Sequence, residues 1–293
     1  MIKIKHLKYY EIDKSKWDNT VSCSDFSLPY FFSWYLDVVS PGWEALIAED
    51  YSYIMPLTVK IKCGIKYVIQ PPFTQQLGVI SLSKNIDCQI INSFIKSIPY
   101  LIYDINLNYN NFSKESKINL IIDAEKYALV SSAYNKNTKR NIAKAINSDL
   151  KIRKIDLSQF VNLLNSTECK IKQNKSLLID LLNVLYEKHS LYVRGIFKDE
   201  MLIAGVAAIE SLDRMIYLIP ISTNDGKKYS AMFLLLDDLI KYSMDMGYTF
   251  DFEGSMIPGV QNFYKGFGGK EQLYYRAHRL RNNKLFEYLH KIF

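Results

Sequence analysis

The sequence predicts an α+β protein built from two lobes of similar construction. An apolar content of 48% in 293 residues is enough for a sizeable core. The order strand, strand, helix, acidic strand also occurs twice along the chain, which predicts an internal duplication. Hairpins followed by helices are common, so a chance match is the alternative. We expect an N-terminal lobe over residues 1–130 and a C-terminal lobe over residues 131–293.

The first copy of the repeat opens with a hairpin. Its strands are expected over Ser52–Ile61 and Lys66–Phe73, joined by a tight turn at Lys62, Cys63 and Gly64. A helix over Ile86–Ile98 follows, and then the acidic strand Tyr103–Asn106. Ahead of this copy, the aromatic residues of Tyr30–Trp43 recur at helical spacing, which favours an amphipathic core helix.

The second copy has nearly the same dimensions. Its strands are expected over Met201–Glu210 and Met215–Ser222, followed by a helix over Tyr229–Met246 and the acidic strand Phe250–Glu253. Tyr67 and Tyr217 then occupy equivalent places in the two hairpins. They precede the acidic residues Asp104 and Asp251 by 37 and 34 residues, respectively.

A basic helix is expected between the two copies, within residues 134–150, with Asn137 or Thr138 as its N-cap. Lys139 and Arg140 fall in its first turn, where cations oppose the helix dipole. Their position is explained if an anionic substrate group binds at this helix end. The alternative is an exposed basic helix that links the lobes.

Two further segments are candidate binding sites. Residues 222–230 place Gly226, Lys227, Lys228, Tyr229 and Ser230 between a strand and a helix, which is either a phosphate-binding loop or a simple turn. Neither a dinucleotide fingerprint nor a P-loop motif is present.

The second segment crowds three glutamines, Gln70, Gln75 and Gln76, beside two prolines at the end of an apolar strand. The amides are expected to recognise a substrate, or else to satisfy a broken strand edge themselves.

The stretch FDFEGSMIPGVQNFYKGFGGK, residues 250–270, is the strongest candidate for a catalytic site. If the strand continues to Glu253, alternation places Asp251 and Glu253 on one face and the two phenylalanines on the other. A loop and a short helix over Gln261–Phe267 follow, and this helix carries Tyr264. The alternative is a strand end capped by charges and a turn made of glycines.

Charge and cysteine usage limit the class of protein. The net charge of +7 favours phosphate-bearing or acidic partners without requiring nucleic acid. The four cysteines show no paired spacing, so neither a metal site nor a disulfide framework is expected. No signal-peptide core and no apolar run of about 20 residues is present, so we expect a cytoplasmic protein without a membrane span.

Residues 137–145, the second hairpin, residues 227–248 and residues 250–270 together resemble the second domain of Fem-like proteins, the double-GNAT proteins related to peptidoglycan aminoacyltransferases. The resemblance implies two GNAT-like lobes packed across a cleft, each with a mixed, mostly antiparallel sheet flanked by helices. It implies acceptor binding by the first lobe and donor binding by the second. It also implies that residues 280–293 fold back onto the first lobe.

The resemblance further implies N-acyl transfer to an amine, on a cell-envelope or sugar-linked acceptor, without a permanently bound cofactor. The donor would be an acyl-CoA or an aminoacyl-tRNA, and the latter would be used as in members that lack a coiled-coil arm. Glu253 would act as general base and Tyr264 as general acid, with Asp251 as a second candidate base. Lys227, Lys228, Tyr229 and Ser230 would hold the donor phosphate.

Two departures and two alternatives accompany this interpretation. The phosphate loop retains a single glycine, Gly226, and the spacing around Tyr264 differs from the GNAT pattern by about two residues. One alternative is a double-GNAT binding protein without turnover. The other is nucleic-acid binding through Lys136–Lys154 and the cluster Arg276, Arg279 and Arg281.

Overall fold

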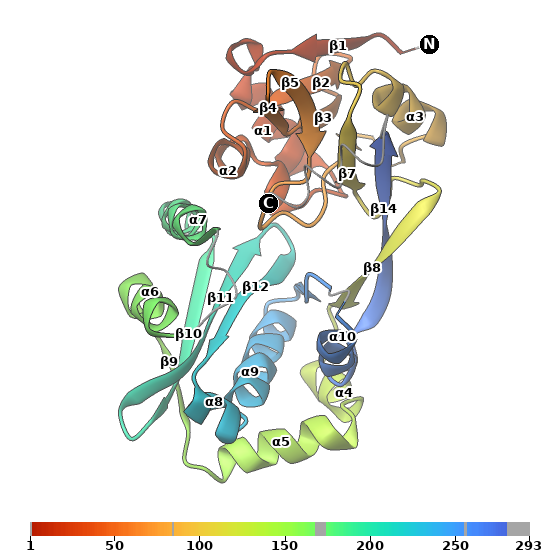
Figure 1. The fold of residues 1–293 in the computed structure, drawn as a ribbon. Helices are drawn as coiled ribbons and strands as arrows, with labels where there is room; N and C mark the ends of the chain where they lie inside the picture. The colour runs from red at the N-terminus through yellow and green to blue at the C-terminus, as the bar shows by residue number, and fades with distance from the viewer. Residues whose placement is uncertain (1, 84, 168–173, 255–256, 280–293) are drawn as a thin grey trace. The chain divides into compact units, whose positions relative to one another are not determined.

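The computed structural model describes residues 2–83, 85–167, 174–254 and 257–279. The chain divides into two compact units (Figure 1). Unit 1 contains the chain up to Lys117 and again from Leu273, whereas unit 2 contains Ile118–Gln272. Both crossings fall inside strands, namely β8 (Glu115–Ile122) and β14 (Lys270–Arg279). The first crossing lies ahead of the boundary expected after residue 130, and Leu273–Arg279 belongs to unit 1. Residues 280–293, expected to fold back onto the first lobe, lie outside the described residues.

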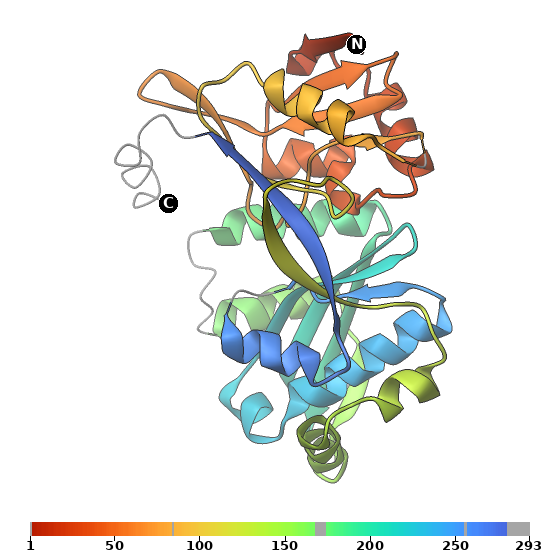
Figure 2. The same cartoon turned by 90° about the vertical axis from the view of Figure 1, so that its right-hand side faces the viewer.

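Unit 1 holds two sheets, with strand orders β1-β2-β3-β6 and β4-β5-β7-β14. Helix α3 packs its Phe94 into the core of this unit together with Val68 and Ile105, and Figure 2 shows this helix lying against the strands. The elements in chain order are β1 (Ile4–Leu7), η1 (Tyr9–Glu11), α1 (Lys14–Cys23), η2 (Pro29–Phe31), α2 (Ser33–Val39), β2 (Glu44–Ala48), β3 (Tyr53–Leu57), β4 (Val59–Lys62), β5 (Ile65–Ile69), β6 (Ile80–Ser81), α3 (Cys88–Lys96) and β7 (Tyr103–Leu107).

The strand expected over Ser52–Ile61 is split at Thr58. Its first part, β3, pairs with β2, and its second part, β4, forms the expected hairpin with β5. The Thr58 hydroxyl donates to the Ile69 carbonyl at 2.5 Å, which fixes the point where the chain changes sheets. The hairpin turns at Cys63 and Gly64, both with positive φ. The helix expected over Tyr30–Trp43 is shorter, because only α2 is regular there.

Unit 2 holds one sheet with the strand order β8-β13-β12-β11-β10-β9. Its pairings among the described residues are antiparallel except for β12 with β13, which is parallel. The further elements are α4 (Tyr127–Ser132), α5 (Lys136–Ile146), β9 (Lys151–Lys154), α6 (Leu157–Ser166), α7 (Lys175–Glu187), β10 (Leu191–Lys198), β11 (Met201–Ser211), β12 (Arg214–Ser222), α8 (Asn224–Lys228), α9 (Ala231–Asp245), β13 (Thr249–Asp251) and α10 (Pro258–Lys265).

The sheet of unit 2 is covered on both faces (Figure 1). Val206 of β11 packs in the core cluster with Leu235 and Leu239 of α9. The neighbouring Gly205 points to the opposite face, where an added Cβ would lie 3.0 Å from Leu163 of α6. Helices α9 and α6 therefore cover opposite faces, and the side chain of each β12 residue faces one or the other.

The repeated order is confirmed. In unit 1 the β4–β5 hairpin leads through α3 to β7, which runs parallel to β5 and places Asp104 opposite Ile69. In unit 2 the β11–β12 hairpin leads through α9 to β13, which runs parallel to β12 and places Asp251 opposite Ile216. By this register Tyr67 corresponds to Arg214, three residues before the expected counterpart Tyr217.

No described helix is long and apolar enough to cross a membrane.

Candidate active site

The main feature of unit 2 is a fork between β12 and β13. The parallel pairing covers only three residue pairs and ends with Ile216 opposite Asp251. Beyond this point β12 continues from Tyr217 to Ser222, still paired with β11 on its other side. Among the described strands none pairs with this part of β12 on the β13 side. Pro220 lies in it and pairs with Val206 of β11. This fits a strand edge, because proline in a sheet is confined to edge strands and bulges, where its missing NH faces no partner strand.

The chain turns sharply at the base of the fork. Strand β13 ends at Asp251, and Glu253 and Gly254 both adopt positive φ, 56° and 52°. A Cβ on Gly254 would lie 2.6 Å from the Ile118 carbonyl oxygen of β8, so only glycine fits against that strand. Since the strand ends before Glu253, the expected sharing of one face by Asp251 and Glu253 is wrong.

Asp251 is bound on all sides within unit 2. It is 1% exposed, and its carboxylate accepts hydrogen bonds from Arg214 Nη1 at 2.6 Å and Asn119 Nδ2 at 2.9 Å. It also accepts from the backbone NH of Glu253 at 2.8 Å, which holds the left-handed turn. This geometry assigns Asp251 to the support of the turn, so Glu253 is the carboxylate that we retain as the candidate base. Glu253 is half-buried.

Tyr264 lies on α10, on the same side of the sheet as α9. Its ring stacks on Phe252 with a centroid distance of 4.8 Å and meets Tyr217 edge-on at 6.0 Å. Burial, and then the nearby Glu253 carboxylate, raise the pKa of the Tyr264 hydroxyl well above its usual range. Glu253 and Tyr264, predicted as base and acid, are therefore close enough to influence each other electrostatically.

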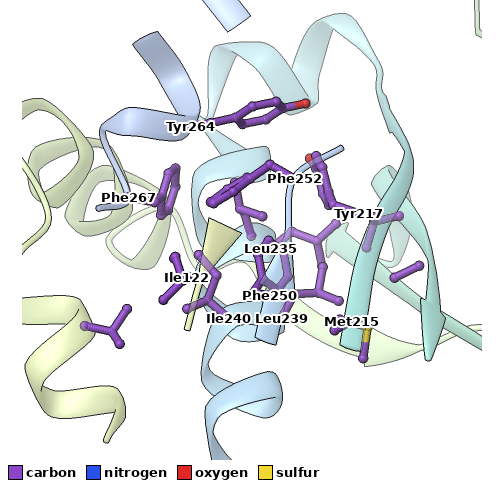
Figure 3. Packing of buried hydrophobic residues seen from close by; sticks show 14 of the residues in the cluster. Ile122, Met215, Tyr217, Leu235, Leu239, Ile240, Phe250, Phe252, Tyr264 and Phe267 are labelled. Carbon is purple, nitrogen blue, oxygen red and sulfur yellow. The ribbon is translucent and has the colours of Figure 1, made fainter. Parts of the chain in front are cut away.

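Tyr217 is a residue of this site that sequence reasoning did not include. It is the first residue of β12 past the last pair with β13, and Figure 3 shows its ring beside Phe252 and Tyr264. Its only sequence signal was its place in the repeat.

The loop after β12 is held close to the sheet. Thr223 is the N-cap of the single-turn helix α8, and its hydroxyl also donates to the Ile203 carbonyl at 3.0 Å. A Cβ on Gly226 would lie 2.4 Å from the same carbonyl oxygen. Close packing against β11 thus requires a glycine at this position. This requirement agrees with the alternative in which residues 222–230 form a simple turn.

The four residues predicted to hold a phosphate separate in the structure. Lys227 lines a polar pocket of about 300 Å³ together with Ser166, Thr167, Ser222, Thr223 and Asn224. Lys228 lies over the ring of Tyr229, with its Nζ 5.3 Å from the centroid. Ser230, at φ 57°, precedes α9 and donates its hydroxyl to Asn141 at 3.0 Å. Of the four, Lys227 fits best as an anion ligand.

Lys139 and Arg140 have local partners. The N-cap of α5 is Asn135, earlier than predicted, and its side chain accepts from Thr138 N. Lys139 Nζ donates to the Ser132 carbonyl at 2.7 Å, which places a cation at the favourable C-terminal end of α4. Arg140 donates to Asn137 Oδ1 at 2.8 Å. These contacts explain the basic first turn without a bound anion.

The glutamines of unit 1 occupy the place that is open in unit 2. Strand β5 stops pairing with β7 at Ile69 opposite Asp104. Gln70 Oε1 then accepts from Asn106 N at 3.0 Å, and its Nε2 donates to the Thr74 carbonyl. Leu77 N donates to the Asn106 carbonyl at 3.0 Å, so the segment from Gln70 to Leu77 covers the edge of β7.

The other two glutamines are engaged in the same segment. Gln75 accepts from Asn106 Nδ2 through its backbone carbonyl, and Gln76 donates to Gln75 Oε1. Gln76 is fully buried. The bond from Asn106 N to Gln70 supports the alternative in which an amide satisfies a broken strand edge, whereas Gln76 Oε1 is buried with no hydrogen-bond partner among the described residues.

The basic cluster near the C-terminus is also engaged. Arg276 bonds both carboxylate oxygens of Asp104 at 2.6 Å and Glu115 at 2.9 Å. Arg279 donates to the carbonyls of Tyr100 and Leu101, and Arg281 lies outside the described residues. The two described arginines thus form hydrogen bonds with residues of unit 1 in and next to its sheet.

Solved structures provide the comparison with known proteins. The chain is similar to a FemX crystal structure, with a TM-score of 0.67 and 10% identity over 97% of this chain and 99% of that one. It is similar to the C-terminal domain of a putative lysylphosphatidylglycerol synthetase from Agrobacterium fabrum, with a TM-score of 0.57 and 10% identity over 92% of each chain.

A third similar structure is a tandem GNAT protein from the clavulanic acid biosynthesis pathway, with a TM-score of 0.56 and 6% identity over 96% of this chain and 100% of that one. No model of a known protein family matches the sequence, and no curated protein matches it. At these identities the likeness shows the fold. The chain has a fold similar to those of the FemX structure and the tandem GNAT protein.

Proposed function

We propose that this double-GNAT protein is an N-acyltransferase that binds an activated acyl donor at the β12–β13 fork of unit 2. The observation that carries the proposal is the difference between the two forks. In unit 1 the segment from Gln70 to Leu77 covers the edge of β7. In unit 2 β12 continues past Ile216 with no described strand paired to it on its β13 side. Backbone groups on such an edge suit the amides of an extended donor.

The chemistry follows from the residues at the fork. A carbonyl carbon of a thioester or ester is attacked by a neutral amine, so a base must accept a proton and an acid must protonate the leaving group. Glu253 accepts the amine proton, directly or through water. Tyr264 gives its proton to the leaving sulfur or oxygen. A raised pKa keeps Tyr264 protonated at neutral pH, as an acid requires.

The pocket lined by Lys227 is the proposed site for a donor phosphate. It combines the Lys227 ammonium with the Thr167 hydroxyl, which has no hydrogen-bond partner among the described residues. Both groups are donors suited to phosphate oxygens. An acyl-CoA and an aminoacyl-tRNA both join an activated carbonyl to phosphates, so the donor class stays open between them. Acetyl-CoA, named for the clavulanic acid pathway protein, is the first donor to test.

The proposed acceptor is an amine. The lysylphosphatidylglycerol synthetase domain and FemX are both related by fold, and we propose an amine on a cell-envelope or sugar-linked acceptor, reached from the cytoplasm.

Thermal shift and transfer assays test the proposal together. Acetyl-CoA or an aminoacyl-tRNA should raise the melting temperature of the protein. Glu253→Gln should keep that shift and lose transfer by about 100-fold or more, since a general base contributes about 10²–10⁴-fold. Glu187→Gln, an exposed glutamate at the end of α7, is the matched control and should leave transfer unchanged.

Two outcomes would count against the enzyme. Binding of a donor with no transfer by the unsubstituted protein would favour a double-GNAT binding protein. Binding of RNA alone, with an affinity that falls steeply as salt rises, would favour nucleic-acid binding.

A further inference from the structure

The hydroxyl of Tyr217 is buried at the fork without an evident structural use. Tyr217 is 2% exposed, and its Oη has no hydrogen-bond partner among the described residues. Burying a hydroxyl without a partner is unfavourable, and phenylalanine would fill the same space without that cost. The ring needs no hydroxyl to pack, because its contacts are with Phe250 at 6.2 Å and Tyr264 at 6.0 Å.

The position of this hydroxyl relates it to Tyr264. The two rings meet edge-on, with an interplanar angle of 89°. Figure 3 shows the Tyr217 hydroxyl pointing toward the side of the cluster on which Tyr264 lies. Burial, and then Tyr264, raise the pKa of the Tyr217 hydroxyl, so the two phenols are electrostatically coupled and Tyr217 stays a hydrogen-bond donor at neutral pH.

The proposed reaction creates an acceptor for this donor. When the acyl–sulfur or acyl–oxygen bond breaks, Tyr264 gives its proton to the leaving group and becomes a phenolate. The acyl–nitrogen bond forms in the same transfer, and the amine proton passes to Glu253. A phenolate is costly in a buried site unless a hydrogen bond is donated to it. The proton on Glu253 then returns to Tyr264 and restores both groups.

We propose that Tyr217 is a positioning residue for Tyr264. As the leaving group departs, the Tyr217 hydroxyl donates a hydrogen bond to the Tyr264 phenolate oxygen. The inference rests on the proposed function and adds to it a residue on a different element, β12, at the first position past the last strand pair. It gives the buried hydroxyl a partner that exists only during the reaction, which is the condition for accelerating the chemical step.

A double-mutant cycle between Tyr217 and Tyr264 tests the inference, with acetyl-CoA and an aminoacyl-tRNA as the donors assayed. Tyr217→Phe should lower kcat by about 10- to 100-fold with the donor KM unchanged, as expected for one hydrogen bond to a charged group. Its urea midpoint should equal or exceed that of the unsubstituted protein. In the Tyr264→Phe background the same substitution should have no further effect.

A matched control is Tyr67→Phe, a buried tyrosine on β5 of unit 1, which should leave kcat unchanged. If Tyr217→Phe keeps kcat within twofold while Tyr264→Phe loses it, the inference is overturned and the proposed function stands. Losses that simply multiply in the double variant would also overturn it. If the unsubstituted protein transfers from neither donor, the proposed function fails and the inference fails with it.

Discussion

The strongest stability prediction concerns the buried ion pair that holds the turn at Glu253 and Gly254. The side chains of Arg214 and Asp251 are 9% and 2% exposed, and Arg214 Nη1 lies 2.6 Å from Asp251 Oδ2. Asp251→Asn removes the negative charge that lies against the buried guanidinium. Breaking a buried pair in this way costs about 3–5 kcal/mol. In a unit of this size that corresponds to a fall in Tm of about 6–20 °C.

Urea unfolding followed by far-UV circular dichroism measures this cost. The midpoint of Asp251→Asn should fall, and Arg214→Met should fall by a similar amount because it leaves the carboxylate unpaired. The double variant Arg214→Met/Asp251→Leu should recover much of the loss, since it leaves neither charge buried. Asp199→Asn, at an exposed aspartate between β10 and β11, should stay within about 0.5 kcal/mol of the parent. An Asp251→Asn loss below about 1 kcal/mol would refute the reasoning.

Three further predictions address the turn, the donor pocket and unit 1. Gly254→Ala should destabilise unit 2 by at least about 1–2 kcal/mol from its left-handed φ alone. Gly259→Ala in α10, where an added Cβ meets nothing within 4 Å, should be neutral or stabilising in the same urea unfolding assay. Lys227→Ala should weaken acetyl-CoA binding by about tenfold in calorimetry, and Lys228→Ala, whose ammonium lies over Tyr229, should weaken it less; equal losses would contradict the pocket. Burial opposes ionisation of Glu44, but hydrogen bonds from Tyr100, Lys8 and His6 outweigh it and lower the pKa of that carboxyl. The ionised Glu44 carboxylate therefore stabilises the folded protein above the unfolded-state pKa of about 4.3, and this stabilisation is lost as the pH falls through the folded-state pKa. The difference in urea midpoint between the unsubstituted protein and Glu44→Gln should accordingly shrink from pH 7 to pH 3.

The repeat could be read from the sequence because its signals are local. Turn residues such as Cys63 with Gly64 and Leu212 with Asp213 mark the hairpins. Each acidic strand follows a segment whose apolar residues recur at helical spacing. The crossings between units could not be read in this way. Strands β8 and β14 carry the chain from one unit to the other, and which strand a segment pairs with depends on distant residues.

The split of one predicted strand at Thr58 has a similar cause. The residues next to Thr58 are suited to strands except for Pro56, so propensity over most of the segment predicts one element. The break depends on the hydrogen bond from Thr58 to Ile69, which only the folded chain brings together.

The residues of the candidate site differ in how far the sequence indicates their place in the structure. Glu253 and Tyr264 could be found from their order along the chain, but alternation failed at Glu253 because the turn depends on Gly254 fitting against Ile118 of β8. The role of Asp251 had an available signal. Arg214 is the only charged residue in the apolar strand RMIYLIPIS, and a charge buried there requires a partner of opposite sign. Asp251, on the acidic strand of the same copy of the repeat, could have been predicted as the partner of Arg214.

The central claim is that the open edge of β12 binds the donor, and amide hydrogen exchange tests it most directly. Exchange is compared with and without saturating acetyl-CoA, and then with and without an aminoacyl-tRNA. It is followed at the backbone amides of the non-proline residues within 217–222 and, as an internal comparison, within 68–77. The proposed site predicts that one of the two donors slows exchange within 217–222 and leaves 68–77 unchanged, because the edge of β7 is already covered. Slowing confined to 68–77, or none in 217–222 with either donor, would contradict it.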